Sequence, residues 1–292
     1  MCIIIAKYFP GTGWAGAKNR DRKYTPTLDF IIEDIGDVER CMMHDQVTGY
    51  REGLNSSGVS ILNTSLDVLE DEPGIEEGTV EVSPDGKLIA KALLEKTPRD
   101  AVNVLLRGKL VGCTIVFDQE TLYLIEASDQ DGTRPYRYAV KEIPQDQTVA
   151  RTNHGLWLEW ASFQRKADDP EQTRDRISSE SRLAQAQFVV EHAQEPMDLV
   201  DGMCQIFVDH PQLNIMRTST GKGEFRTTSQ QLCVPKEHTL YCRPVSSNLQ
   251  FDFWKLNQPK RNTWVEILSN RELWKKNRKD LPFDKMHLKD VK

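Results

Sequence analysis

The order of secondary-structure elements constrains the fold of this 292-residue chain more than any other feature of its sequence. Residue patterns predict runs of strands that are interrupted twice by a pair of helices, without a regular alternation of strand and helix. This order favours two stacked, mainly antiparallel sheets with helices outside over a parallel, doubly wound sheet. The sequence has no internal repeat and neither a G-x-G-x-x-G nor a Walker-type phosphate loop. It therefore predicts an α+β chain.

The expected strands share apolar runs or alternations that are bounded by turn-forming residues. They cover residues 2–8, 14–21, 28–33, 38–44, a strand ending at 54, then 59–63, 113–117, 122–127, 136–143, 148–151, 225–234, 239–243 and 250–254. The expected helices cover residues 87–94, 98–106, a long segment from 170, 197–208 and 264–276. We expect one domain over residues 1–254, followed by a basic C-terminal helix and tail over 255–292.

The net charge of −6 argues against a general nucleic-acid or membrane-surface binder. Residues 251–292 differ from the rest, because they carry eleven Lys/Arg against six Asp/Glu. Nucleic-acid binding through the expected basic helix is therefore one alternative function. The other reading is that its apolar face docks on the domain and its charges face water.

The six cysteines are scattered, without a Cys-x-x-Cys pair or a paired histidine spacing. This pattern predicts neither a zinc site nor a disulfide framework, and we expect no metal and no cofactor. No apolar run approaches the ~20 residues that span a bilayer. The N-terminus also lacks the features of a signal peptide. A reduced, cytoplasmic setting is the simplest expectation.

Cys2 follows the initiator Met directly and begins an apolar, β-branched strand. If Met1 is removed, the thiol gains a base within its own residue, the free α-amine. That amine has an ordinary pKa of about 7.7–8.0, which suits a general base at neutral pH. The turn at residues 11–13 would return the chain so that Asp21 lies beside Cys2. The alternative is that Cys2 is only a small apolar residue of a buried strand.

Three islands of sequence together resemble the cysteine N-terminal nucleophile (Ntn) hydrolases. They are Cys2 with Asn19-Arg20-Asp21, then Gly53-Leu54-Asn55-x-x-Gly58-Val59, and Thr152-Asn153-His154. The similar groups are the Asn-Arg-Asp-Glu (NRDE) family, the acyl-CoA:6-aminopenicillanate acyltransferase-like group and the choloylglycine hydrolase/penicillin V acylase group. The resemblance extends to about residue 243. One departure is Arg22, which stands where the NRDE motif has glutamate.

The resemblance implies a four-layer αββα sandwich and cleavage or transfer at a carbon–nitrogen bond, usually of a small linear amide. Cys2 would be the nucleophile and would form a thioester, which water or an amine then resolves. Asp21 matches the aspartate that holds the α-amine. Asn153 matches an oxyanion-hole asparagine, and Asn63 lies where relatives place a second oxyanion donor.

The resemblance also implies arginines and a pocket wall. A distal arginine is expected at Arg226, with Arg217 as its rival. Arg20, the arginine of the motif, either pairs with Asp21 or points at the substrate. Lys18 lies where bile-salt hydrolases keep an arginine, so both residues are candidates for substrate binding, and which of them faces the pocket stays open. Trp157 and Trp160, which follow Asn153, are candidates for the wall of an acyl pocket. Ser181-Arg182 matches a pair that recurs in the family, and we expect this pair to be structural.

Two further readings stay open at this stage. The first is a glutaminase-type amidotransferase domain, and Ile3 and Asn19-Arg20-Asp21 count against it. The second is a non-catalytic binding protein that retains the fold. The sequence names neither the acyl group nor the amine, and it leaves the assembly state open, a homo-oligomer included.

Overall fold

The computed structural model describes residues 2–24, 26–66, 84–128, 136–158, 170–218, 224–244, 252–257 and 265–269. Within these residues the strands form two seven-stranded sheets, and every pair of neighbouring strands is antiparallel. The first sheet has the order β10-β1-β2-β11-β12-β13-β14 and the second has the order β3-β4-β5-β6-β7-β8-β9.

The strands of the first sheet are β1 (Cys2–Phe9), β2 (Gly13–Arg22), β10 (Val149–Arg151), β11 (Arg226–Val234), β12 (Thr239–Pro244), β13 (Asp252–Asn257) and β14 (Val265–Ser269). Those of the second sheet are β3 (Leu28–Ile35), β4 (Val38–Asp45), β5 (Arg51–Asn55), β6 (Ser60–Thr64), β7 (Gly112–Phe117), β8 (Leu122–Ser128) and β9 (Arg137–Glu142). The helices are α1 (Pro84–Ala92), α2 (Pro98–Arg107), α3 (Pro170–His192), α4 (Pro196–Gly202) and the 3-10 turn Pro235–Glu237.

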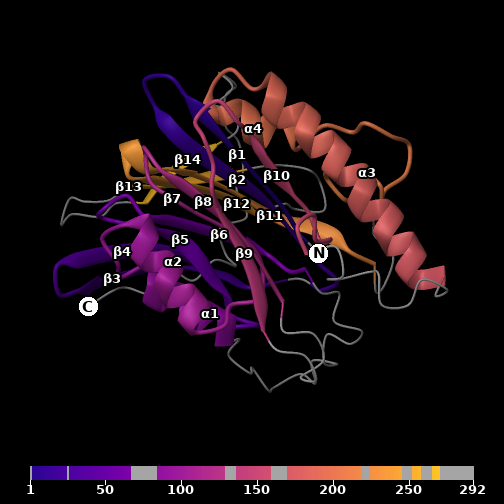
Figure 1. Cartoon of the computed structure of the whole chain (residues 1–292). Coiled ribbons are helices and arrows are strands. Elements are labelled where there is room, and N and C mark those ends of the chain that lie inside the picture. The colour runs from indigo at the N-terminus through magenta and orange to yellow at the C-terminus, as the bar shows by residue number, and fades with distance from the viewer. Residues whose placement is uncertain are drawn as a thin grey trace.

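Alternation along β1 shows how the layers form. Ile4 and Ala6 pack between the two sheets, whereas Ile3 and Ile5 pack against the layer of α3 and α4. A third apolar cluster lies between the second sheet and the helices α1 and α2. The helix pairs cover opposite outer faces, with both sheets between them (Figure 1). The four-layer αββα sandwich expected from the sequence is confirmed.

The two sheets approach closely at Gly16 of β2. A Cβ atom at this position would lie 2.6 Å from the ring of Phe117 on β7. Real side-chain carbons do not come this close to a neighbour, so a larger residue would push the sheets apart. Gly16 therefore lets the two sheets pack closely at this point of β2.

Two predicted helices differ from the structure. The helix expected over 197–208 ends at Gly202, and the backbone N–H groups of Phe207 and Val208 donate to Asn214 Oδ1 instead of continuing the helix. The second is the helix expected over 264–276, where residues 265–269 instead form strand β14, paired with β13. Short apolar runs fit either pattern, and an open sheet edge favours the strand.

The boundary expected after residue 254 falls inside β13, so the first sheet includes residues from both sides of it. The rest of the expected C-terminal helix lies outside the described residues. The division into a domain and a tail stays a prediction. Among the described residues, no helix has both the length and the apolar character needed to cross a membrane.

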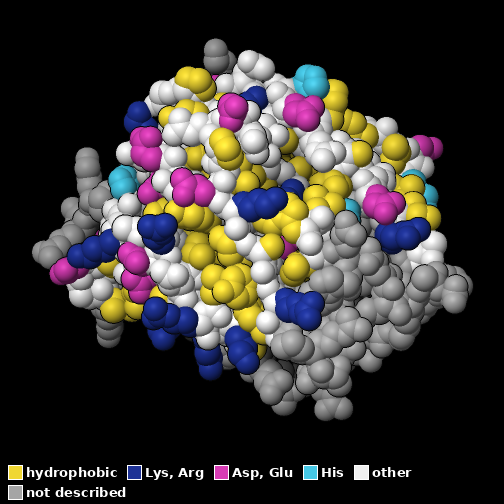
Figure 2. Space-filling view, in the orientation of Figure 1, with side chains coloured by type: hydrophobic (Ala, Val, Ile, Leu, Met, Phe, Trp, Pro, Cys, Tyr) yellow, Lys and Arg dark blue, Asp and Glu magenta, His cyan; other side chains and the backbone are white. Residues whose placement is uncertain are grey.

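Charged side chains of both signs occur across the face shown in Figure 2, separated by apolar and neutral ones. On this face, the described residues form no continuous surface of a single charge sign.

Candidate active site

Cys2 begins β1 at one end of the first sheet, between β10 and β2. It is 4% exposed and lies directly opposite Arg20. Residues two apart in a strand project on the same face, so the Cys2 side chain points, like that of Ile4, toward the second sheet. Arg22 Nη1 donates to Cys2 Sγ at 3.6 Å, and Thr64 Oγ1 on β6 donates to the Cys2 carbonyl at 3.2 Å. The thiol is thus held between both sheets, next to a guanidinium.

The thiol of Cys2 is more acidic than an ordinary thiol. Burial raises its pKa, but the positive charges of Lys18, the amino terminus and Arg22 outweigh burial and lower the pKa from 9.0 to about 7. Burial instead raises the pKa of four other thiols, which are those of Cys41, Cys113, Cys233 and Cys242. Reactive cysteines have lowered pKa values and inert buried ones raised values.

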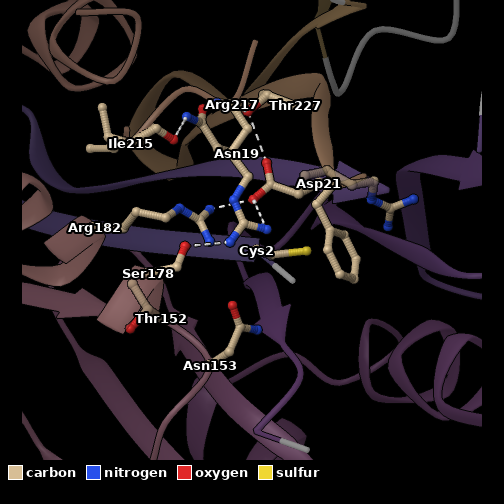
Figure 3. Close-up of polar contacts among 12 residues, drawn as sticks. Cys2, Asn19, Asp21, Thr152, Asn153, Ser178, Arg182, Ile215, Arg217 and Thr227 are labelled. Atoms are coloured by element: carbon tan, nitrogen blue, oxygen red, sulfur yellow. Dashed lines mark hydrogen bonds and ion pairs between the residues drawn. The ribbon is translucent and has the colours of Figure 1, made fainter. Parts of the chain in front are cut away.

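Asp21 projects from the opposite face of β2, toward α3. Its Oδ2 forms a buried ion pair with Arg182 Nη2 and lies 3.9 Å from Arg217 Nη1. Thr227 Oγ1 on β11 donates to its Oδ1 at 2.8 Å. Figure 3 shows the carboxylate enclosed by these side chains, close to Cys2. Ser181-Arg182, which we expected to be structural, thus includes a direct partner of Asp21.

The two candidate distal arginines lie on different sides of β2. Arg217 is buried at Asp21, and its Nη2 donates to Ser178 Oγ on α3 at 2.6 Å. Burial, helped by the charge of Arg182, lowers the pKa of Arg217 to about 9. Arg226 begins β11 directly opposite Arg22. The structure therefore brings Arg217 to Asp21, and it places Arg226 beside the arginine that contacts the thiol.

Asn153 follows β10 and is connected to Cys2 by one intervening hydroxyl. Its Nδ2 donates to Thr64 Oγ1 at 3.0 Å and to the Ser65 carbonyl at 2.7 Å, and Thr64 donates in turn to the Cys2 carbonyl. Its backbone N–H donates to Ser179 Oγ on α3 at 3.1 Å. Asn153 thus lies on the other side of Cys2 from Asp21 (Figure 3).

His154 supports the Asn153 segment and has no described contact with Cys2. Its Nδ1 lies 2.9 Å from Ser179 Oγ and 3.1 Å from Thr152 Oγ1. Burial lowers the pKa of the imidazole, so the neutral form is favoured. Because Ser179 also accepts from Asn153, α3 and His154 together anchor the oxyanion candidate.

Lys18 and Arg20, the expected substrate-binding residues, both bind Glu52 on β5. Lys18 Nζ donates to the two Glu52 oxygens at 2.7 and 2.6 Å and also to the Asn63 carbonyl. Arg20 Nη2 donates to Glu52 Oε1 at 2.8 Å. All three side chains are 1% exposed or less. Sequence reasoning missed Glu52, although a carboxylate in a strand that precedes Gly53-Leu54 was the available signal.

Asn63 has its side chain committed to other partners. Its Nδ2 donates to Thr114 Oγ1 at 2.7 Å and to the Val111 carbonyl at 3.2 Å, and its Oδ1 accepts from Tyr50 at 2.5 Å. Both amide hydrogens are therefore used by β7 and the residue that precedes it. The next residue, Thr64, contacts Cys2 instead.

Trp157 lies in a separate group of contacts. Its backbone N–H donates to Glu126 Oε2 at 2.7 Å, and its ring packs against Lys141 and Arg151. None of its described contacts is with Cys2 or Asp21. Trp160 lies outside the described residues. Within the described part of the chain, no group of three or more His, Cys, Asp or Glu side chains is placed to hold a metal ion.

No protein-family model matches the chain, and no curated protein does. Among solved structures, the chain is similar to the C2A variant of the conjugated bile acid hydrolase from Clostridium perfringens, with a TM-score of 0.52 and 10% identity. The match covers 93% of this chain and 98% of the other. That variant replaces a cysteine at position 2, where this chain also has cysteine. The comparison shows that the chain shares the stacked-sheet fold of this hydrolase.

Proposed function

We propose that the protein hydrolyses a carbon–nitrogen bond in a small linear amide, with Cys2 as the nucleophile after removal of Met1. One observation carries the proposal. The second residue of the chain is a buried thiol whose pKa is lowered to about 7, whereas burial raises the pKa of other buried thiols in the same fold. The shared fold with a conjugated bile acid hydrolase supports the same class of reaction.

In the proposed first step, the α-amine of Cys2 takes the thiol proton and becomes an ammonium, the sulfur bonds to the amide carbon, and the carbonyl π electrons move to oxygen. The tetrahedral intermediate then collapses, the carbon–nitrogen bond breaks, and the leaving nitrogen takes a proton from the α-ammonium of Cys2. This step produces a thioester and a free amine. Water, deprotonated by the α-amine, hydrolyses the thioester to a carboxylic acid and restores the thiol. An amine in place of water would make the reaction an acyl transfer.

Two residues have assigned roles in this mechanism. Thr227 and Arg182 hold the carboxylate of Asp21, and we assign this carboxylate to orient the α-amine that removal of Met1 creates. The amide of Asn153 would exchange one of its neutral acceptors for the oxyanion. Such a donor contributes about 2.7–4 kcal/mol to stabilisation of the transition state.

The test begins with intact mass, which must show loss of Met1. The purified protein is then incubated with a panel of N-acyl amides that includes conjugated bile salts and glutamine, and amine release is measured. Wild type is compared with Cys2→Ala and with Cys204→Ala, which removes a thiol that lies elsewhere, against Val200 and Gln230.

Amine release that is lost only in Cys2→Ala, with an acyl group trapped on Cys2, supports the proposal. Retention of Met1 together with an inert Cys2 contradicts it and favours a non-catalytic binding protein. Turnover of glutamine alone would instead identify a glutaminase-type domain.

A further inference from the structure

Thr64 lies at the end of β6 and faces the first sheet. Leu62, two residues earlier on the same strand, packs in the apolar cluster between the sheets, and residues two apart in a strand share a face. Thr64 therefore points toward β1, where its Oγ1 donates to the Cys2 carbonyl at 3.2 Å. Thr64 is 1% exposed. Its hydroxyl is thus a buried contact between the second sheet and the residue that carries the candidate nucleophile.

The backbone of Thr64 is fixed by the neighbouring strand β7. Thr64 is paired with Cys113, and Gly112 precedes that residue with a φ of +121°. A Cβ atom at Gly112 would lie 2.4 Å from the Thr64 carbonyl oxygen. Only glycine adopts this conformation and allows this approach without strain. The close approach of β7 therefore holds the end of β6 in one position.

The hydrogen bonds through the Thr64 hydroxyl have only one possible direction. The Cys2 carbonyl can accept a hydrogen bond but cannot donate one, so the single hydroxyl hydrogen of Thr64 is used there. Thr64 Oγ1 then presents its lone pairs to the Asn153 amide, 3.0 Å away. The Ser65 carbonyl, 2.7 Å from the same Nδ2 atom, is also an acceptor. Both contacts therefore require the NH2 end of the Asn153 amide.

This polarity decides which end of the Asn153 amide is available near Cys2. Figure 3 shows the amide on the side of Asn153 that faces Cys2. An oxyanion is stabilised by a hydrogen-bond donor, whereas a carbonyl oxygen in the same place would repel it. The two acceptors thus present the end of the amide that an oxyanion needs.

One of the two acceptors has to release its hydrogen when the amide donates to an oxyanion. The contact with the Ser65 carbonyl is partly buried and Ser65 is exposed, so water can replace the amide there. The contact with Thr64 is buried, and breaking it would remove the one donor to Thr64 Oγ1 among the described residues, at a depth where water does not replace it. The oxyanion therefore takes the hydrogen that is bound to Ser65, and the contact with Thr64 stays.

We propose that Thr64 is a positioning residue, which holds the Asn153 amide toward Cys2 in the transition state. Its hydroxyl joins the backbone of the nucleophile to the oxyanion donor, so one group from the opposite sheet aligns both. The side chain of threonine suits this role, because branching at Cβ restricts its χ1 angle. The inference rests on the proposed function in taking Asn153 as the oxyanion donor.

The test compares amide turnover by the full-length protein with alkylation of its Cys2 by iodoacetamide, with the alkylated site confirmed by peptide mass. Alkylation attacks a saturated carbon and forms no oxyanion. Thr64→Val should therefore lower kcat for amine release by about 10–10²-fold, with little change in KM, and leave the alkylation rate within about twofold of wild type. Thr64→Ser keeps the hydroxyl and should recover most of kcat.

A double variant shows whether Thr64 acts through Asn153. Thr64→Val combined with Asn153→Ala should be no slower than Asn153→Ala alone, because the group that Thr64 positions is already absent. The matched control is Thr239→Val at the start of β12. Thr239 is also 1% exposed, and its hydroxyl donates to the Glu237 carbonyl at 3.0 Å. This control should keep kcat near that of wild type.

Two results would overturn the inference. The first is a parallel loss of kcat and of the alkylation rate in Thr64→Val, because it places the effect on Cys2 or on the whole fold. The second is a loss of kcat that persists undiminished when Asn153 is already alanine.

The wild-type protein provides a further measurement if Thr64→Val does not fold. NMR of the isotope-labelled protein follows hydrogen exchange at Asn153 Nδ2, whose signals are identified by their absence in Asn153→Ala. The hydrogen bound to the buried Thr64 should exchange slowly, and the one bound to Ser65 should exchange faster. Fast exchange of both hydrogens overturns the inference.

The two proposals fail separately. If the protein cleaves no amide, the proposed function fails, and the exchange measurement still decides whether Thr64 holds the Asn153 amide. If the protein cleaves amides and Thr64→Val turns over like wild type, the inference about Thr64 fails and the proposed function stands.

Discussion

Arg182 of α3 forms a buried ion pair with Asp21 of β2, although 161 residues separate them in the chain. Ser178, one turn earlier on the same helix, accepts from Arg217, which also faces Asp21. Helix α3 is thereby attached to the sheet next to Cys2 by polar contacts. This attachment makes the position of the site depend on the helix layer.

Arg182→Met should lower the free energy of unfolding by about 3–5 kcal/mol, because it removes one partner of a buried ion pair. The Asp21 carboxylate then keeps only Arg217 and Thr227 as partners among those described above. Urea denaturation followed by circular dichroism measures the loss. The matched control is Arg176→Met on the same helix, which breaks only the exposed pair with Glu180. Exposed pairs contribute about 0–1 kcal/mol, so equal losses in the two variants would contradict the buried contact.

The stability of the protein should depend on pH through Cys2. The thiol pKa is about 7 in the fold against an ordinary 9.0, so the folded protein holds fewer protons on this thiol than the unfolded chain between these pH values. The unfolding free energy should therefore rise from pH 7 to pH 9, by at most about 3 kcal/mol, and this contribution is lost as the pH falls through 7. The measurement is urea denaturation at both pH values for wild type and Cys2→Ala. A constant difference between the two proteins would show that the thiol is not ionised in the fold.

Asn153→Ala should lower kcat by about 10²–10³-fold with a smaller change in KM, because the lost amide acts on the oxyanion. Steady-state amine release measures both constants. Asn63→Ala is the matched control, since it removes an amide that donates to Thr114 and Val111. Asn63→Ala should reduce stability and leave kcat much closer to wild type. A larger loss of kcat in Asn63→Ala would restore the oxyanion role first expected for that residue.

Glu126→Gln should loosen the segment after Asn153. The buried carboxylate accepts the backbone N–H groups of three consecutive residues, 156–158, and also Arg151 Nε at 3.0 Å. The glutamine amide has one acceptor oxygen and a donor where these N–H groups point, so about 1–3 kcal/mol of stability should be lost. Hydrogen exchange of residues 153–158 should accelerate. Glu120→Gln, at an exposed turn, is the control and should leave this exchange unchanged.

The sequence predicted much of the fold because the decisive signals are local. The alternation of Ile3, Ile4 and Ile5 assigns each side chain to a face of β1, and the order of strands and helices then leaves few architectures. Locality also explains the errors. Residues 265–269 are apolar in a way that suits a helix or a strand, and the open edge of β13 decided between them.

The sequence by itself determined the element order as far as β13, the buried first strand and a cysteine at its start. Only the tertiary structure decided which charges meet. Lys18 and Arg20 bind Glu52 from the other sheet, and Asp21 meets Arg182 from a later helix. Alternation sets the face from which a side chain projects, but the partner of a buried charge is set by how the sheets and helices pack over that face. That packing made Lys18 and Arg20 neighbours of a carboxylate instead of open pocket residues, and it gave Cys2 its cationic surroundings.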